Sequence, residues 1–354
     1  MARPVGKKIA IESSLRNAPS MIYRELSAAE FDSARALFTQ VFKKEASPAW
    51  WHWKYRGEGL IDAIHIGAFD ARSSLCGHVG ALVTEVQQSP LRSVSEGKGT
   101  ALEQANMYPK VMIQICDVMV SDERRGQRAS GFIYRDLMQR MAQHLAHRWP
   151  QGFAYGFPGM RPHLLGEKLG FYHAIARYGL SHWTPVEGVL EPLAWTRLYD
   201  WLEDVSLLDA RQSVSAAHQI VLARNRRYLS WRYEKHPEVS YQCWGIYKRS
   251  WLRKKLIGWL VSKPWNASQR LIVDGWTTHS GLVSSHTAID AQITQPWLIW
   301  ARLNGEHSHP VIATQFRYAG DFELGHDLQQ ASQSIQARLR GDLVPFTAGD
   351  TDVF

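Results

Sequence analysis

A short basic segment in the first half of the chain has the residue types of an anion-binding site. The sequence "RRGQRASG" (124–131) combines two glycines with Arg124, Arg125 and Arg128. It follows the apolar run "MIQICDVMV" (112–120), which reads as a strand, and it precedes an amphipathic helical pattern. The first backbone N–H groups of a helix have no partner within it, and the helix dipole adds partial positive charge there. The segment therefore predicts a pyrophosphate cradle, although a solvated basic surface has the same composition.

Two amphipathic helices are predicted in this half. The first lies in "AAEFDSARALFTQVF", where the apolar residues at helical spacing are Phe31, Ala34, Leu37, Phe38 and Val41. The second follows the basic segment, and its apolar face is formed by Phe132, Ile133, Leu137, Met138, Met141 and Leu145. Further on, "GFAYGF" and "GFYHAIARY" read as strands on either side of a short helix in "PHLLGEKL". Helices and strands thus alternate through the first half.

An aromatic motif occurs twice, 178 residues apart. "WWHWKY" (50–55) and "YLSWRY" (228–233) both end in Trp, a basic residue and Tyr. An ungapped comparison of 53–83 with 231–261 gives six identities and one basic exchange in 31 positions. An internal repeat of this kind indicates that the fold is duplicated within the chain. Trp53 and Tyr55 are then expected to pack a helix end onto a sheet in the first half.

The segments around the two motifs have parallel patterns. Each motif follows a helical pattern, which in the second half is "SAAHQIVLARNRRYL" (215–229), and precedes two short apolar runs that predict a β-hairpin. Each hairpin is followed by a strand that ends in an aspartate, Asp117 in "MIQICD" and Asp274 in "RLIVD". The chain therefore predicts a duplicated α+β fold, and coincidental alternation of elements is the alternative. The second half has no counterpart of the basic segment.

Composition restricts the class of protein. The 354 residues carry a net charge of +8, which suits acidic partners such as nucleic acid, an anionic membrane or a phosphorylated cofactor. No basic helix or nucleic-acid motif accompanies the charge, so nucleic acid is not expected. Three cysteines, far apart and without metal-ligand spacing, indicate a reducing compartment and no metal site. With no signal peptide and no long apolar run, we predict a cytoplasmic protein without a membrane span.

At this point the residues resemble the GNAT superfamily of acyl-CoA-dependent N-acetyltransferases. The marks are "CDVMV", the loop "RRGQRASG" with the helix after it, and "EKLGFYH". More narrowly, the chain looks like a bacterial subgroup with tandem GNAT modules, in its segments "WHWKY", "DVMV", "YGFP" and "YLSWRYEKHP". The resemblance implies two tandem α+β domains, each with a mixed, mostly antiparallel twisted sheet flanked by helices. We expect a flexible tail (1–20), a GNAT domain with the acyl-CoA site (21–185) and a degenerate GNAT-like domain (186–354).

The resemblance also implies which residues hold acyl-CoA. The sheet would be split between its fourth and fifth strands, with acyl-CoA in the split. The main chain of three residues would bind the pantetheine arm: Val118, Met119 and Val120. The pyrophosphate would be held by Arg125, Gly126, Gln127, Arg128, Ala129, Ser130 and Gly131. Arg128 stands where GNATs usually have Gly, so it either crowds the phosphate or binds it through its guanidinium.

Acyl transfer to an amine further needs a base and an acid. Asp117 is predicted to accept the ammonium proton, directly or through water, and a structural hydrogen bond is its alternative role. Many GNATs carry a tyrosine as the acid at the position of Gly166 here. His163 and Tyr172 are therefore the candidates for the missing acid. Cys116 is expected to lie in the core, because neighbouring strand residues point to opposite faces.

Three functions remain open from the sequence. The first is an acyl-CoA-dependent N-acyltransferase that moves an acetyl group to a primary amine of a small molecule, for example an amino sugar, by direct transfer in a ternary complex. The second is a catalytically degenerate module that binds CoA or a partner. The third is an aminoacyl-tRNA-dependent transferase. The polar segment Gln87 to Pro109 is predicted to be a long loop that acts as a lid or specificity element.

Overall fold

The computed structural model describes residues 21–87, 110–125, 128–183, 193–197, 221–249, 254–277, 297–302 and 311–318. The predicted tail (1–20) and the predicted lid beyond Gln87 lie outside these residues. The chain divides into two compact units that interleave in sequence. Unit 1 holds the described residues up to Ala46, Ile64–Gly80 and Asp117–Gln143, and unit 2 holds the others. Each unit is described by itself below.

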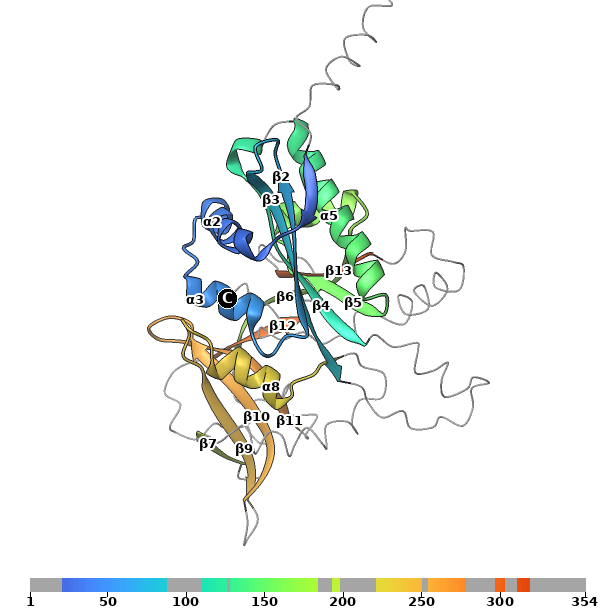
Figure 1. The fold of residues 1–354 in the computed structure, drawn as a ribbon. Coiled ribbons are helices and arrows are strands. Elements are labelled where there is room, and N and C mark those ends of the chain that lie inside the picture. The colour runs from blue at the N-terminus through green and yellow to red at the C-terminus, as the bar shows by residue number, and fades with distance from the viewer. Residues whose placement is uncertain are drawn as a thin grey trace, which may run out of the picture. The chain divides into compact units, whose positions relative to one another are not determined.

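The described elements are those of an α+β fold, as predicted (Figure 1). The helical elements are η1 (Ala28–Glu30), α2 (Phe31–Phe42), α3 (Pro48–Arg56), η2 (Asp122–Arg124), α5 (Arg128–Arg148), α6 (Met160–Lys168), α8 (Arg226–Leu229) and η3 (Ser230–Glu234). The strands are β1 (Ile22–Glu25), β2 (Asp62–Phe69), β3 (Leu75–Gln87), β4 (Val111–Val120), β5 (Gly152–Gly156), β6 (Tyr172–Trp183), β7 (Leu193–Arg197), β8 (Val221–Leu222), β9 (Gln242–Arg249), β10 (Lys254–Pro264), β11 (Arg270–Thr277), β12 (Trp297–Arg302) and β13 (Val311–Phe316). In the described ranges no helix combines the length and the apolarity needed to cross a bilayer.

In unit 1 the strand order is β1-β2-β3-β4, and helix α5 covers this sheet. The close approach is visible at Gly77 of β3, where a Cβ atom would lie 2.9 Å from Leu137 Cδ1 and 3.1 Å from Ile133 Cγ2. The predicted apolar face of α5 is confirmed except at Phe132, which is 52% exposed. At about 100° per residue, Phe132 stands about 140° around the helix from the fully buried Leu137.

The start of α5 corrects one predicted boundary. The sequence places Arg128 to Gly131 in a loop before the helix, whereas α5 begins at Arg128. These four residues are therefore the first turn of a 21-residue helix. The backbone N–H groups of Arg128, Ala129 and Ser130 are among those that an α-helix leaves without an intrahelical acceptor.

In unit 2 the strand order from β4 to β7 is β4-β5-β13-β6-β12-β11-β10-β9-β7. β4 and β5 pair in parallel from Val111 with Gly152 to Ile115 with Gly156. β13 then pairs antiparallel with both β5 and β6, so it lies between two strands that are neighbours in sequence. The sheet of the predicted first domain thus contains strands from the predicted second domain. The boundary near residue 185 stays a prediction.

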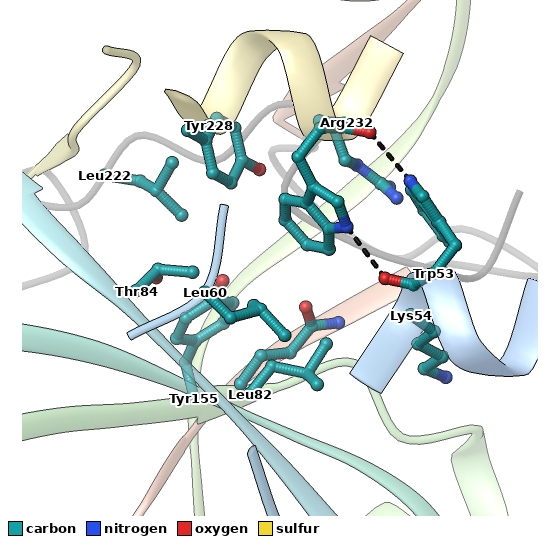
Figure 2. A pocket seen from close by; sticks show the side chains of 11 residues that line it. Trp53, Lys54, Leu60, Leu82, Thr84, Tyr155, Leu222, Tyr228 and Arg232 are labelled. Atoms are coloured by element: carbon teal, nitrogen blue, oxygen red, sulfur yellow. Dashed lines mark hydrogen bonds between the residues drawn. The ribbon is translucent and has the colours of Figure 1, made fainter. Parts of the chain in front are cut away.

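The two copies of the aromatic motif meet in unit 2. Ser47 caps α3 by accepting a hydrogen bond from Trp50 N, and the helix buries Trp53. The indole of Trp53 donates to the carbonyl of Trp231 (2.7 Å), and the indole of Trp231 donates to the carbonyl of Trp53 (2.8 Å), as the dashed lines in Figure 2 show. Reciprocal contacts between equivalent residues are the mark of a two-fold axis. The repeat therefore has a local pseudo-two-fold axis at these tryptophans.

The helix predicted for 215–229 is wrong at the described residues 221–225 and is confirmed only at Arg226–Leu229. Val221 and Leu222 form strand β8, which pairs with the end of β3. A short helix begins only at Arg226, with Asn225 as its N-cap accepting from Tyr228 N. The pairing of Leu222 with Val86 outweighs local helical spacing, because burial on a sheet is a tertiary effect that periodicity does not report.

Candidate functional site

Asp117 interrupts the regular geometry of β4. Its backbone φ is +47°, in the left-handed region that few residues other than glycine adopt. Asp is one of the residues that tolerate this region. Asp117 is half-buried, in contrast to its buried neighbours Cys116 and Met119. The predicted base thus stands at an irregular point of the strand that leads to the basic segment.

A histidine that the sequence analysis missed contacts this point, and a second histidine contacts the first. His78 Nδ1 lies 3.0 Å from the carbonyl oxygen of Asp117, and His78 Nε2 lies 2.9 Å from His65 Nδ1. Both histidines belong to the β2–β3 hairpin of unit 1. A signal for them was present, since "HIGAF" and "HVGALV" each place a histidine in an otherwise apolar strand.

The predicted cradle is described only in part. Gly126 and Gln127 lie outside the described residues. The Arg125 guanidinium donates from Nε to the carbonyl of Val120 (2.9 Å) and pairs with Asp122 (3.0 Å). Lys43, which the sequence analysis missed, lies 2.7 Å from Asp122 and lowers the pKa of that carboxyl mainly through this hydrogen bond. Arg125 thus fixes the turn between β4 and α5 as well as adding charge.

Arg124 is also anchored by an acidic partner. Its guanidinium lies 3.3 Å from Asp70 in the turn between β2 and β3. The pKa of Asp70 is lowered first by the hydrogen bond from Ser74 N, so this carboxylate is ionised at neutral pH. The turn after β4 is therefore pinned at two places within unit 1, by Arg124 and by Arg125.

The residues predicted to bind the pantetheine arm lie on β4 beyond its pairing with β5. The pairing of β4 with β5 stops at Ile115, whereas β4 continues to Val120. Val118 and Val120 are half-buried, and Met119 faces the core with 1% exposure. A side chain at Gly77 would lie 3.1 Å from the Met119 carbonyl, so β3 approaches this strand closely.

The two predicted acids belong to unit 2, whereas Asp117 belongs to unit 1. His163 is 5% exposed on α6, and its Nε2 is 3.9 Å from Glu167 Oε2, too far for a hydrogen bond. Among the described residues its Nδ1 has no hydrogen-bond partner. His163 is thus a buried residue of α6 with an unsatisfied ring nitrogen.

Tyr172 occupies the space beside Gly166. A Cβ atom at Gly166 would lie 2.1 Å from Tyr172 Cδ2 and 2.6 Å from Cε2. The Tyr172 ring therefore fills the volume into which a side chain at position 166 would project. Tyr172 is 4% exposed and packs edge-on against Phe316 (6.1 Å between centroids).

The counterpart of Asp117 in the second half has a structural environment. Asp274 is 2% exposed, accepts a bifurcated hydrogen bond from Arg224 Nε, which lies 2.8 Å from each carboxylate oxygen, and accepts one of 2.7 Å from the Tyr233 hydroxyl. Gly275 N donates to the same carboxylate at 2.9 Å. Burial and the neighbouring Asp274 charge raise the pKa of Tyr233 well above its usual value. The Asp274 carboxylate thus has a structural role, because it is buried and hydrogen-bonded in the core of unit 2.

Most aromatic rings of the repeat motifs serve packing. A cavity of about 20 Å³ remains among the rings of Trp53, Tyr155, Tyr228 and Trp231 in unit 2, with room for about one water molecule. Figure 2 shows Leu60, Leu82 and Leu222 around the same space. Cys116 lies in the core, as predicted, with its Sγ 3.5 Å from the Tyr55 hydroxyl.

Comparison with solved structures shows which known proteins share this fold. No protein-family model and no curated protein matches the chain. A structure from Enterococcus faecalis described as a probable N-acyltransferase has a TM-score of 0.58 at 14% identity, over 85% of this chain and 74% of that chain. A GCN5-related N-acetyltransferase from Anabaena variabilis has a TM-score of 0.57 at 13% identity, over 85% and 73%. A tandem GNAT protein from the clavulanic acid biosynthesis pathway has a TM-score of 0.52 at 10% identity, over 86% and 100%.

Proposed function

We propose that this chain, which has the fold of the GNAT N-acetyltransferases, transfers an acyl group from acyl-CoA to a primary amine. The observation that carries the proposal is the order of two described elements of unit 1: β4 carries the irregular Asp117, and α5, which begins at Arg128, is the next α-helix in the chain. The first N–H groups of such a helix have no intrahelical acceptor. A pyrophosphate is the ligand that such a helix start favours.

Acyl-CoA supplies a thioester whose acyl carbon the amine attacks. In the proposed reaction the main chain of Val118–Val120 holds the pantetheine arm, and the first turn of α5 holds the pyrophosphate. Asp117 takes the proton of the acceptor ammonium, directly or through water, and so leaves a neutral amine. The new bond joins nitrogen to the acyl carbon, and the bond from that carbon to sulfur breaks. Tyr172 then gives its proton to the departing thiolate, and the proton that the nitrogen loses as the amide forms returns to the tyrosine through solvent.

The assignment of the acid to Tyr172 rests on the packing at Gly166. The tyrosine that many GNATs place at this position is absent, and the Tyr172 ring fills the same volume. His163 stays an alternative, since its Nδ1 lacks a partner among the described residues. The acceptor is proposed to be a small molecule such as an amino sugar, and the acyl group to be acetyl.

A non-catalytic CoA-binding module is the second candidate. The ion pairs of Arg124 with Asp70 and of Arg125 with Asp122 favour it, because they offset part of the charge near the cradle. Binding and turnover separate the two candidates: both bind acetyl-CoA, and only the enzyme releases free thiol when a panel of amines is added.

The first test is calorimetric titration of the purified chain with acetyl-CoA. We expect micromolar binding, and a loss of at least about tenfold in the Arg125→Ala, Arg128→Ala double variant, since each charge-assisted hydrogen bond contributes about 1.5–3 kcal/mol. Arg135→Ala is the matched control, because Arg135 is an exposed arginine further along α5 whose partner is Asp136. Absence of binding by the unaltered chain would refute the proposal.

Tyr172→Phe tests the acid. The variant keeps the ring that packs on Gly166 and removes only the hydroxyl. We expect kcat to fall about 100-fold, which is within the range for general acids, with little change in KM for acetyl-CoA. The alkaline limb of the pH profile of kcat should also disappear. An unchanged kcat would transfer the assignment to His163, for which His163→Gln is the parallel variant.

A further inference from the structure

We infer that His78, held by His65, is a positioning residue that fixes the backbone of Asp117 and thereby orients Val118–Val120 toward the acyl arm. The inference deepens the proposed function and rests on it. Neither histidine belongs to the residues that the sequence indicates for acyl-CoA binding or for proton transfer. All the contacts that carry the inference lie within unit 1.

The carbonyl of Asp117 lies at a point where the strand geometry is irregular. In a regular strand, a carbonyl is paired by an N–H of the neighbouring strand. A residue with φ of +47° departs from that geometry, and a buried carbonyl without a partner is costly. The Asp117 carbonyl accepts a hydrogen bond from a side chain of the adjacent strand, His78 Nδ1 on β3, at 3.0 Å. A side-chain donor thus holds the irregular conformation in place.

This contact fixes the tautomer of His78. A carbonyl oxygen can only accept, so the hydrogen must be on His78 Nδ1. When both rings are neutral, His78 Nε2 is then an acceptor, and the hydrogen between the two rings belongs to His65 Nδ1, 2.9 Å away. His65 is itself held, since its carbonyl accepts from Leu26 N (3.0 Å) and its ring meets Phe31 edge-on. His65 therefore donates a hydrogen bond to His78, and His78 donates one to the carbonyl of Asp117.

Burial makes the arrangement rigid. His78 is fully buried, and the neighbouring Gly77 faces Leu137 of α5. Because successive strand residues point to opposite faces, His78 lies on the face of the sheet away from α5. Without the His78 donor, Asp117 loses one hydrogen bond that holds its φ of +47°, and rotation toward extended backbone changes the direction in which Val118–Val120 continue. The main chain of Val118–Val120 would then no longer point toward the same ligand.

The test compares three variants of His78 by acetyl-CoA titration and thermal melting. In His78→Asn the side-chain amide places an N–H near the position of Nδ1, whereas His78→Leu fills the space without a donor. We expect His78→Leu and His78→Ala to bind acetyl-CoA about tenfold more weakly, the effect of one lost hydrogen bond to a buried group, and His78→Asn to bind within about threefold of the unaltered chain. His52→Asn, at an exposed histidine of α3, is the control.

A second readout does not depend on activity. Nitrogen-15 NMR of the histidine rings should show His78 as the Nδ1–H tautomer at neutral pH, and a slowly exchanging ring proton that disappears in His78→Asn. The Nε2–H tautomer at His78, or equal weakening of binding by the Asn and Leu variants, would overturn the inference. If the unaltered chain does not bind acetyl-CoA, the proposed function and the positioning role both fail, while the NMR result still decides whether the histidine pair forms.

Discussion

Gln315→Pro is expected to unfold the sheet of unit 2 and to yield little soluble protein. Gln315 lies in β13 and pairs with Tyr155 of β5 on one side and with His173 of β6 on the other. Proline removes a backbone donor and is excluded from central strands, at a cost of about 3 kcal/mol or more. That is a large share of the roughly 5–15 kcal/mol by which a domain is stable. Urea unfolding followed by circular dichroism measures the effect.

A matched control separates this effect from a general intolerance of proline. Ala267 lies exposed in the turn between β10 and β11, where Ser268 N and Asn266 N are the bonded donors. The Ala267→Pro variant is expected to unfold at nearly the same urea concentration as the unaltered chain. Equal midpoints for the two proline variants would show that β13 does not hold β5 and β6 together.

Arg224→Ala is expected to destabilise the chain by about 3–5 kcal/mol, the usual cost of removing one partner of a buried ion pair. Arg224 is 7% exposed and Asp274 is 2% exposed, so the variant removes the charged donor from a buried carboxylate that also accepts from Tyr233 and Gly275 N. Urea unfolding gives the loss as a change in midpoint at constant slope.

The double variant Arg224→Leu, Asp274→Leu tests the cause. Replacing both members of a buried pair by apolar residues of similar size is often much less harmful than removing one. We therefore expect the double variant to be more stable than Arg224→Ala. A loss below about 1 kcal/mol in Arg224→Ala would mean that solvent reaches Asp274 and that the pair is worth no more than a surface one.

Elements defined by local pattern were predictable from the sequence. The spacing of Ala34, Leu37, Phe38 and Val41 identified the buried face of α2, and all four are buried. The two hairpins and the tandem α+β fold class are confirmed as well, because turn residues and alternation report neighbouring strands. The site residues that depend on acyl-CoA stay predictions.

Features set by distant residues were not predictable. No local signal places β13 between β5 and β6, since that position depends on pairing partners about 140 residues away in sequence, a distance at which periodicity carries no information. The same holds for His78, whose contact with the carbonyl of Asp117 joins two residues that are 39 positions apart in sequence. Phe132 is apolar, but its angle on helix α5 turns it away from the buried face, so the prediction that it is buried is wrong.

The position of β13 also determines when this protein can fold during its synthesis. β5 and β6 leave the ribosome early, but the strand that joins them is made near the end of the chain, at 311–316. At about 5–20 residues per second, roughly 7–30 seconds pass between the two events. Throughout that time both strands present unpaired edges to other chains, which is the condition that favours misassembly. A nascent chain of this protein therefore keeps these edges exposed until β13, the last strand among the described residues, has been released.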